Sequence, residues 1–202
     1  MQRLIEQLPL QRGSHPSRDD GMCAMEMVAW LAGEAHSDEP ECACPVLAAM
    51  VRACNDAMTD QLRNVHLRPL VPQLVNSRRS VAVERARGLL AVDCMVRDLL
   101  TTWLLRHARQ EEAVLLRELP PIERLEDVRT ARRAIQTFAK DQRAAEWVLD
   151  RALEGVPAPR YVAGVVQVAR ALNDGETWAK MAALAERMVT AEVTATSAFA
   201  GQ

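Results

Sequence analysis

The residues that could ligate a metal ion lie in one region of the chain. They are Cys23, His36, Cys42 and Cys44. The last three fall within nine residues and have acidic side chains between them. Thiolates and imidazoles are ligands of zinc and iron, so a loop that carries a histidine and a Cys-x-Cys pair could bring three ligands around one ion. One hypothesis for the segment 34–45 is therefore a zinc or iron site.

The spacing of these residues also allows a purely structural interpretation. Zinc motifs commonly place two or more residues between paired cysteines, whereas one residue separates Cys42 from Cys44. Cys23 falls near the start of a predicted helix, whose rise of about 1.5 Å per residue carries the chain roughly 15 Å away before the loop begins. In the structural interpretation Cys23 and Cys42 are small buried hydrophobic groups, and His36 and Asp38 bind backbone groups of the loop. We favour this interpretation, in which no cofactor is bound.

Cys44 also lies immediately before Pro45, at the predicted N-terminus of a helix. A helix dipole stabilises a thiolate at that place, which would make Cys44 a nucleophile or redox sensor with His36 as its base. The pair has no third member and no recognisable oxyanion donors, so a passive thiol is the simpler interpretation. A metal-binding or redox-dependent protein, with enzymatic activity or without, is kept as an alternative function.

The sequence carries none of the usual reaction motifs. It contains no Gly-rich phosphate loop, no GxSxG, no HExxH and no carboxylate pair that spacing singles out. His15 lies in a Gly-Ser-His-Pro-Ser segment, where an anchoring role in a loop is expected. Arginines cluster at 78–87 and 129–133, but acidic residues lie among or beside them, as on a solvated helix face. With a net charge of −2, no nucleic-acid partner is expected.

Composition and periodicity predict an all-α fold, a multi-helix bundle with one irregular loop that contains the His and Cys residues. Apolar residues make up 49% of the chain while aromatic residues supply only 3%, a composition that favours helices over strands. The breaks at Gly33 and Pro45 separate the first two long helices. The helices are expected at about 1–8, 22–32, 45–58, 80–105, 110–119, 160–172 and 176–199.

The C-terminal part carries the most regular apolar spacing. Its members alternate by three and four: Val128, Ala131, Ile135, Phe138, Gln142, Ala145, Leu149 and Ala152. This heptad seam predicts one long helix that ends at Gly155. Together with the two helices after it, this helix would form a C-terminal bundle. The Pro120-Pro121 pair is the best boundary, dividing residues 1–119, an N-terminal helical region with the loop, from the bundle 120–202, the two packed as one globule.

The location of the protein follows from what the sequence lacks. No stretch approaches the roughly 20 apolar residues of a membrane span, and the N-terminus has no signal-peptide core. Five cysteines, an odd number, are expected to be reduced thiols. The expectation is a cytoplasmic protein with no membrane partner.

One block of the chain resembles a known family. It comprises Asp20-Gly21-Met22-Cys23, Gly33-Glu34-x-His36-Ser37-Asp38, Pro40, Cys42 and Pro45. This block is similar to a family of hypothetical proteins from actinomycete bacteria and their phages, over roughly residues 12–105. The resemblance marks the block 20–45 as the hallmark of that family and implies no activity, fold or cofactor for any residue.

The leading functional hypothesis is a non-enzymatic interaction or regulatory protein of bacterial or phage origin. Its N-terminal half would present the loop 34–45, and its C-terminal bundle would offer a surface for a protein partner or for self-association. The heptad seam motivates this second part. A component of a phage virion, or of virion assembly, is a third interpretation that agrees with the resemblance.

Overall fold

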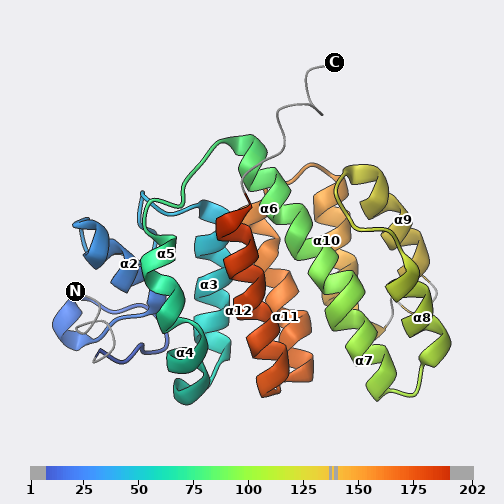
Figure 1. Ribbon diagram of the computed structural model, residues 1–202, viewed down its shortest axis with the longest axis horizontal. Coiled ribbons are helices and arrows are strands. Elements are labelled where there is room, and N and C mark those ends of the chain that lie inside the picture. The colour runs from blue at the N-terminus through green and yellow to red at the C-terminus, as the bar shows by residue number, and fades with distance from the viewer. Residues whose placement is uncertain (1–7, 137, 139–140, 192–202) are drawn as a thin grey trace.

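The computed structural model describes residues 8–136, 138 and 141–191, and these residues form helices and connecting segments with no strand. The predicted all-α class is confirmed. Most helix axes run roughly vertically in Figure 1, and the green helix crosses them obliquely. The predicted helix at 1–8 lies almost entirely outside the described residues.

The helices follow one another through short connections. In chain order they are η1 (Arg18–Asp20), α2 (Ala24–Ala32), α3 (Pro45–Ala57), α4 (Asp60–His66), η2 (Arg68–Leu70), α5 (Val71–Leu74), α6 (Val81–Asp93), η3 (Cys94–Leu100), α7 (Thr101–Arg106), α8 (Gln110–Glu118), α9 (Leu125–Ile135), α10 (Arg143–Leu153), η5 (Ala158–Arg160), α11 (Val162–Leu172) and α12 (Gly175–Thr190). Helix α12 is shorter than predicted, since it ends at Thr190, and residues 192–202 lie outside the described part.

Local sequence signals set the ends of the first helices. Helix α2 begins with a capping box, in which the Cys23 Sγ accepts the Glu26 N–H at 3.4 Å and the Glu26 carboxylate accepts the Cys23 N–H at 2.7 Å. Gly33 ends this helix with a left-handed φ of 74°, a conformation that favours glycine. Pro45 occupies the first turn of α3, and the Thr59 side chain caps α4.

The longest continuous helical stretch among the described residues contacts α3 from the first half of the chain and α11 and α12 from the second. Helices α6, η3 and α7 continue one another from Val81 to Arg106, and η3 is a π-helical segment. Asp93 pairs with Arg97 at 3.3 Å, as the spacing of four predicts, and also accepts the N–H of Ile122 at 3.0 Å. This second hydrogen bond anchors the chain directly after the Pro120-Pro121 break.

The heptad seam does not form the single long helix that the sequence predicts. Its apolar positions are all buried, but α9 ends at Ile135 and α10 begins at Arg143. The Arg132 guanidinium lies 2.6 Å from an Asp150 oxygen, whereas one straight helix would separate residues 18 apart by about 27 Å. The chain therefore folds back, and α9 packs against α10.

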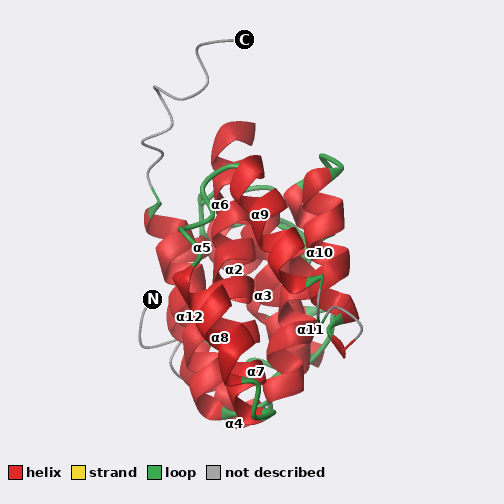
Figure 2. Cartoon of the chain, turned by 90° about the vertical axis from the view of Figure 1, so that its right-hand side faces the viewer, coloured by secondary structure: helices red, strands yellow, loops and turns green. Residues whose placement is uncertain are grey.

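Helices of the C-terminal half pack directly on the N-terminal half. Helix α11 lies against α3, and α12 contacts α3, α4 and α6. The side view in Figure 2 shows α12 on one side of the molecule and α10 and α11 on the other. The buried Arg87 guanidinium of α6 joins α12 to the chain before α6, since it donates to the Met188 carbonyl at 2.7 Å and the Ser77 carbonyl at 2.8 Å.

Candidate functional site

The segment between α2 and α3, which sequence analysis singled out, is closed by one carboxylate. The two Glu34 oxygens accept the N–H groups of Glu41 and Cys42 at 2.7 and 2.8 Å. Burial alone would raise the pKa of Glu34, but hydrogen bonds from Cys42 and Glu41 outweigh burial and lower it. Glu34 is therefore the residue that holds the two ends of this loop together.

Two arginines attach the loop to the rest of the molecule. Arg52 of α3 donates to the Asp38 carbonyl at 2.8 Å and pairs with Glu39 at 2.9 Å. Arg78 donates to the Glu41 carbonyl at 3.0 Å. Because these contacts satisfy backbone and acidic groups of the loop, its irregular sequence is compatible with a defined conformation.

The four predicted ligands have separate surroundings. Cys23 and Cys44 are buried at the N-termini of α2 and α3, and Cys42 is half-buried. The His36 Nε2 lies 3.0 Å from the carbonyl oxygen of His15. Within the described part of the chain, the structure shows no group of three or more His, Cys, Asp or Glu side chains that could hold a metal. Metal binding by these four residues stays a prediction.

Burial also shapes the chemistry of the thiols. It raises the pKa of Cys23 to about 12, and the nearby Glu26 carboxylate acts in the same direction. Burial likewise raises the pKa of Cys54 and of Cys94 to about 12 and raises the pKa of Cys42. Because the thiolate is the reactive form, these four cysteines are poor nucleophiles at neutral pH. Cys44, which is a candidate nucleophile only in the alternative hypothesis, has a fully buried side chain.

Sequence analysis missed the residue at the centre of this region, Glu26. Its carboxylate is 1% exposed and accepts the His15 N–H at 2.6 Å and the Cys23 N–H at 2.7 Å. The His15 Nδ1 lies 2.8 Å away, and the His36 Nε2 lies 3.6 Å away. The Cys23-x-x-Glu26 spacing of a capping box could have revealed one of these contacts. The two histidines come from loops on either side of α2 and could not.

We call the Glu26 carboxylate with its partners His15, Cys23 and His36 the Glu26 centre. Hydrogen bonds keep this carboxylate ionised despite its burial. Burial would raise the pKa of Glu26, but the hydrogen bonds from the backbone of Cys23 and His15 and from the His15 ring together lower it. A carboxylate can only accept, so the His15 Nδ1 must carry a proton, and the His36 Nε2 must carry one to donate to a carbonyl. All of these contacts lie within the protein. The Glu26 centre therefore joins the loops 13–17 and 34–44 to α2.

A second region differs in character, because most of its side chains are apolar and several of these, Val81 and Leu125 among them, are exposed. A hollow of about 240 Å³ lies where the start of α6, the start of α9 and the turn between α10 and α11 meet. We call it the apolar groove. Its lining includes Val81, Leu89, Leu125, Ala152, Val156, Pro157, Ala158 and Tyr161, with Glu84 and Arg85 as its charged members and Gly155 in the turn.

The apolar groove exposes residues that elsewhere would be in the core. Val81 is 72% exposed and Leu125 is 37% exposed, although both are large apolar side chains. Tyr161 is buried, and burial raises the pKa of its hydroxyl to about 12. Sequence analysis missed this groove because three segments far apart in the chain form it. The one indication in the sequence was that Val81 and Leu125 are apolar residues at the first positions of α6 and α9, before the buried residues of those helices begin.

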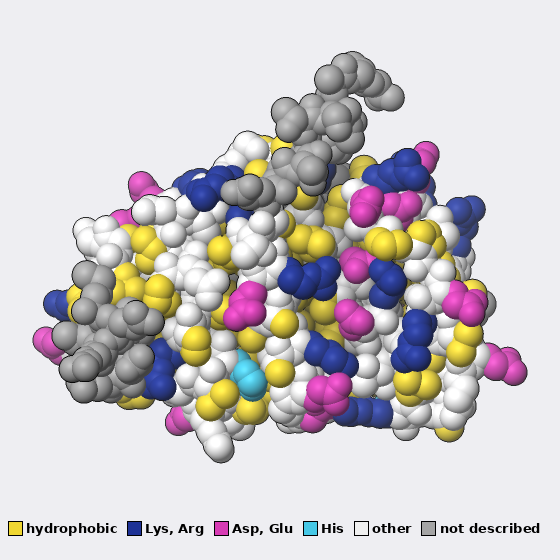
Figure 3. Space-filling model, in the orientation of Figure 1, with side chains coloured by type: hydrophobic (Ala, Val, Ile, Leu, Met, Phe, Trp, Pro, Cys, Tyr) yellow, Lys and Arg dark blue, Asp and Glu magenta, His cyan; other side chains and the backbone are white. Residues whose placement is uncertain are grey.

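On the face shown in Figure 3, acidic and basic side chains are interspersed, with apolar side chains between them. Among the described helices, none is long and apolar enough to cross a membrane. Comparisons with protein-family models, with characterised proteins and with solved structures find no match. The resemblance to the actinomycete and phage family therefore stays a prediction.

Proposed function

We propose that this protein is a non-enzymatic interaction protein that binds an apolar segment of a partner polypeptide in the apolar groove. The observation that carries the proposal is the exposure of Val81 and Leu125 at one hollow. Single exposed apolar side chains are normal, but two that line one concave site provide a place where a partner side chain can be buried.

The dimensions of the apolar groove suit a small anchor of this kind. A hollow of about 240 Å³ lies below the usual range for ligand pockets of drug size, roughly 300–1,000 Å³. It can therefore receive one or two apolar side chains rather than a large cofactor. Full burial of one such side chain contributes about 1.5–3 kcal/mol, which is the size of a hot-spot contact. Glu84 and Arg85 provide a polar rim.

The construction of the groove also supports a preformed binding site. Its floor is rigid, because Tyr161 and Ala158 pack against Gly88 of α6 so closely that a Cβ at that glycine would lie 2.6 Å from each. A rigid floor reduces the entropy lost on binding. The residues of the Glu34 loop, by contrast, use their polar groups to hold the loop itself.

The test selects peptides from a random phage-displayed library on the wild-type protein and removes those that also bind the Val81→Asp/Leu125→Asp variant. We expect selected peptides to carry apolar anchors and to lose at least about tenfold in affinity on this variant, because an aspartate would be desolvated in the complex. Val65→Asp/Val114→Asp is the matched control, since these exposed valines, 58% and 51%, lie in α4 and α8 and do not line the groove.

Two outcomes decide the proposal. Peptides that bind wild type and the control equally, and the groove variant weakly, support it. If no peptide distinguishes the groove variant from the control, while circular dichroism shows that both are folded, the proposal is wrong. Sedimentation of the wild-type protein covers self-association: dimerisation that only the groove variant abolishes would identify a second copy as the occupant.

A further inference from the structure

The π-helical segment η3 forms one side of a second hollow, which is polar and lies apart from the apolar groove. Its volume is about 310 Å³, and its lining residues are Arg97, Asp98, Thr101, Thr102, Arg117 and Lys180. They come from η3, α7, α8 and α12. A π turn inside an α-helix is uncommon and occurs frequently at functional sites. We call this hollow the η3 pocket.

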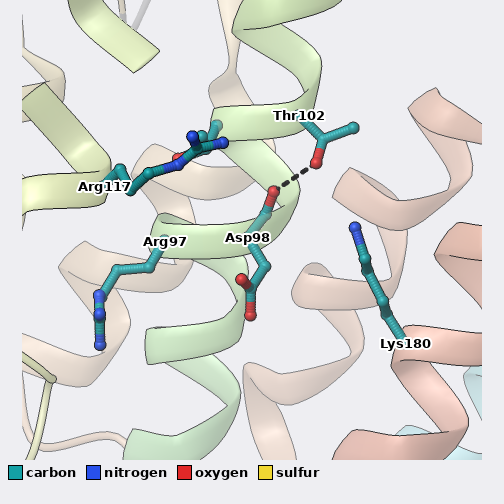
Figure 4. A pocket seen from close by; sticks show the side chains of 6 residues that line it. Arg97, Asp98, Thr102, Arg117 and Lys180 are labelled. Carbon is teal, nitrogen blue, oxygen red and sulfur yellow. Dashed lines mark hydrogen bonds between the residues drawn. The ribbon is translucent and has the colours of Figure 1, made fainter. Parts of the chain in front are cut away.

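Figure 4 shows how the charged side chains of the η3 pocket are arranged. Arg97 and Arg117 lie on one side of Asp98, and Lys180 approaches from the other side. Two of these cations already have a carboxylate partner, since Arg97 pairs with Asp93 at 3.3 Å and Lys180 pairs with Glu176 at 3.0 Å. No ion pair within 4 Å joins Asp98 to another described residue, although these cations line the same pocket.

The cationic side of the pocket has hydrogen-bond donors without partners. The Arg117 side chain makes no hydrogen bond or ion pair with another described residue. Arg97 pairs with Asp93 through Nη1, but its Nε is buried and has no hydrogen-bond partner. The Arg97 Nε has no accessible surface, so the accessible donors are those of the exposed Arg117 side chain, which can bind an acceptor that a ligand supplies. Guanidinium groups match phosphate oxygens in particular, through paired charge-assisted hydrogen bonds.

The other side of the pocket provides acceptors rather than donors. The Thr102 hydroxyl donates to the Asp98 carbonyl at 2.8 Å, so its oxygen is left to accept, and the Asp98 carboxylate can also only accept. A bare anion would be repelled by Asp98. A ligand that combines a phosphate with hydroxyl groups would satisfy both sides, since its phosphate meets the guanidinium groups and its hydroxyls donate to Asp98 and Thr102.

We infer that the η3 pocket binds a small phosphorylated polyol, a phosphate monoester that carries free hydroxyl groups. Arg117 and Arg97 hold the phosphate, Asp98 and Thr102 accept hydroxyl protons, and Lys180 adds positive charge opposite the arginines. The volume is adequate for a ligand of a few carbon atoms. This site is separate from the proposed partner groove, so either proposal can fail without the other.

The test measures binding of glycerol 3-phosphate and of inorganic phosphate to the full-length protein by isothermal titration calorimetry at constant ionic strength. We expect wild type to bind glycerol 3-phosphate more tightly than phosphate. Arg117→Ala should weaken both by about tenfold or more, because it removes a charge-assisted contact. Arg129→Ala is the matched control, since it removes an exposed arginine of α9, outside the pocket, and should leave both affinities within about twofold.

Asp98→Asn separates the two halves of the inferred site. It removes a negative charge, so binding of inorganic phosphate should tighten. An amide is a weaker acceptor for a hydroxyl group than a carboxylate, so the ratio of the affinity for glycerol 3-phosphate to the affinity for phosphate should fall. Binding of neither probe by wild type at millimolar concentration would overturn the inference, as would equal effects of Arg117→Ala and Arg129→Ala. An unchanged preference in Asp98→Asn would overturn the role of the hydroxyl groups. Circular dichroism confirms that each variant is folded.

Discussion

The Glu34 loop and the apolar groove are opposites in how their side chains are used. In the loop, Glu34, Arg52 and Arg78 bind backbone groups or charges of the same protein. In the groove, Val81 and Leu125 are large apolar side chains that remain exposed. The comparison teaches that residue types capable of chemistry can be required by the fold alone, since a loop without regular structure must satisfy its polar groups with side chains. Aliphatic residues without reactive groups can instead form the surface that remains accessible to a partner.

The largest loss of stability is expected in the polar region, when Glu26 is replaced. Glu26→Ala leaves the backbone N–H groups of His15 and Cys23 and the His15 ring without their acceptor inside the protein. We expect a loss of about 3–5 kcal/mol in the free energy of unfolding, measured by urea denaturation. Glu39→Ala, which removes an exposed surface ion pair, should cost less than about 1 kcal/mol. Equal costs for the two variants would show that the Glu26 centre does not organise the loops.

The next effect concerns the floor of the apolar groove. Gly88→Ala would place a Cβ 2.6 Å from the Ala158 Cβ and 2.6 Å from the Tyr161 hydroxyl. We expect it to destabilise the protein by about 1–3 kcal/mol through overpacking, and to weaken peptide binding at the groove. Gly175→Ala is the control, because its nearest neighbour would be 4.0 Å away. Its stability should stay the same or rise by up to about 1 kcal/mol. A neutral Gly88→Ala would contradict a rigid floor.

The decrease in the free energy of unfolding at acidic pH tests the roles of the Glu26 and Glu34 carboxylates. The pKa values of Glu26 and Glu34 are lowered from 4.5 in the folded protein. Their contribution to stability is therefore fully present above pH 4.5 and is lost as the pH falls through the lowered folded-state values. Urea denaturation between pH 3 and pH 7 should show this decline in wild type. Glu26→Gln should flatten it, and an unchanged slope in that variant would count against the role of Glu26.

The smallest expected effects concern the thiols and a metal. Cys42 is the half-buried cysteine and the other four are buried, so a slow alkylating reagent should modify only Cys42 in the native protein, and slowly. The measurement is mass spectrometry after timed quenching, with the urea-unfolded protein as control. Rapid modification of Cys44 would revive the nucleophile hypothesis. Elemental analysis that finds stoichiometric zinc or iron, with a melting temperature lowered by chelator, would establish the metal site.

Sequence reasoning was most successful where a local signal decides the structure. Gly33 and Pro45 were expected to bound the segment between the first two long helices, and the structure places a left-handed glycine and a first-turn proline there. The seam from Val128 to Ala152 predicted burial correctly but continuity wrongly. Phe138 itself lies outside both α9 and α10; the Arg109 guanidinium lies 5.1 Å from the centre of the Phe138 ring and pairs with Asp141 at 3.1 Å. Periodicity records which side chains are buried and does not record where a helix bends back on itself.

The sequence by itself determined the all-α class, several helix ends and the members of most buried stripes, because these depend on residues within a few turns of one another. Only the tertiary structure decided what those elements do together. It brought His15 and His36 to Glu26, Val81 to Leu125, and Arg117 and Lys180 to the π-helical segment. Each of these groupings joins residues from separate loops or helices, so its geometry depends on how the elements pack and no spacing along the chain reveals it.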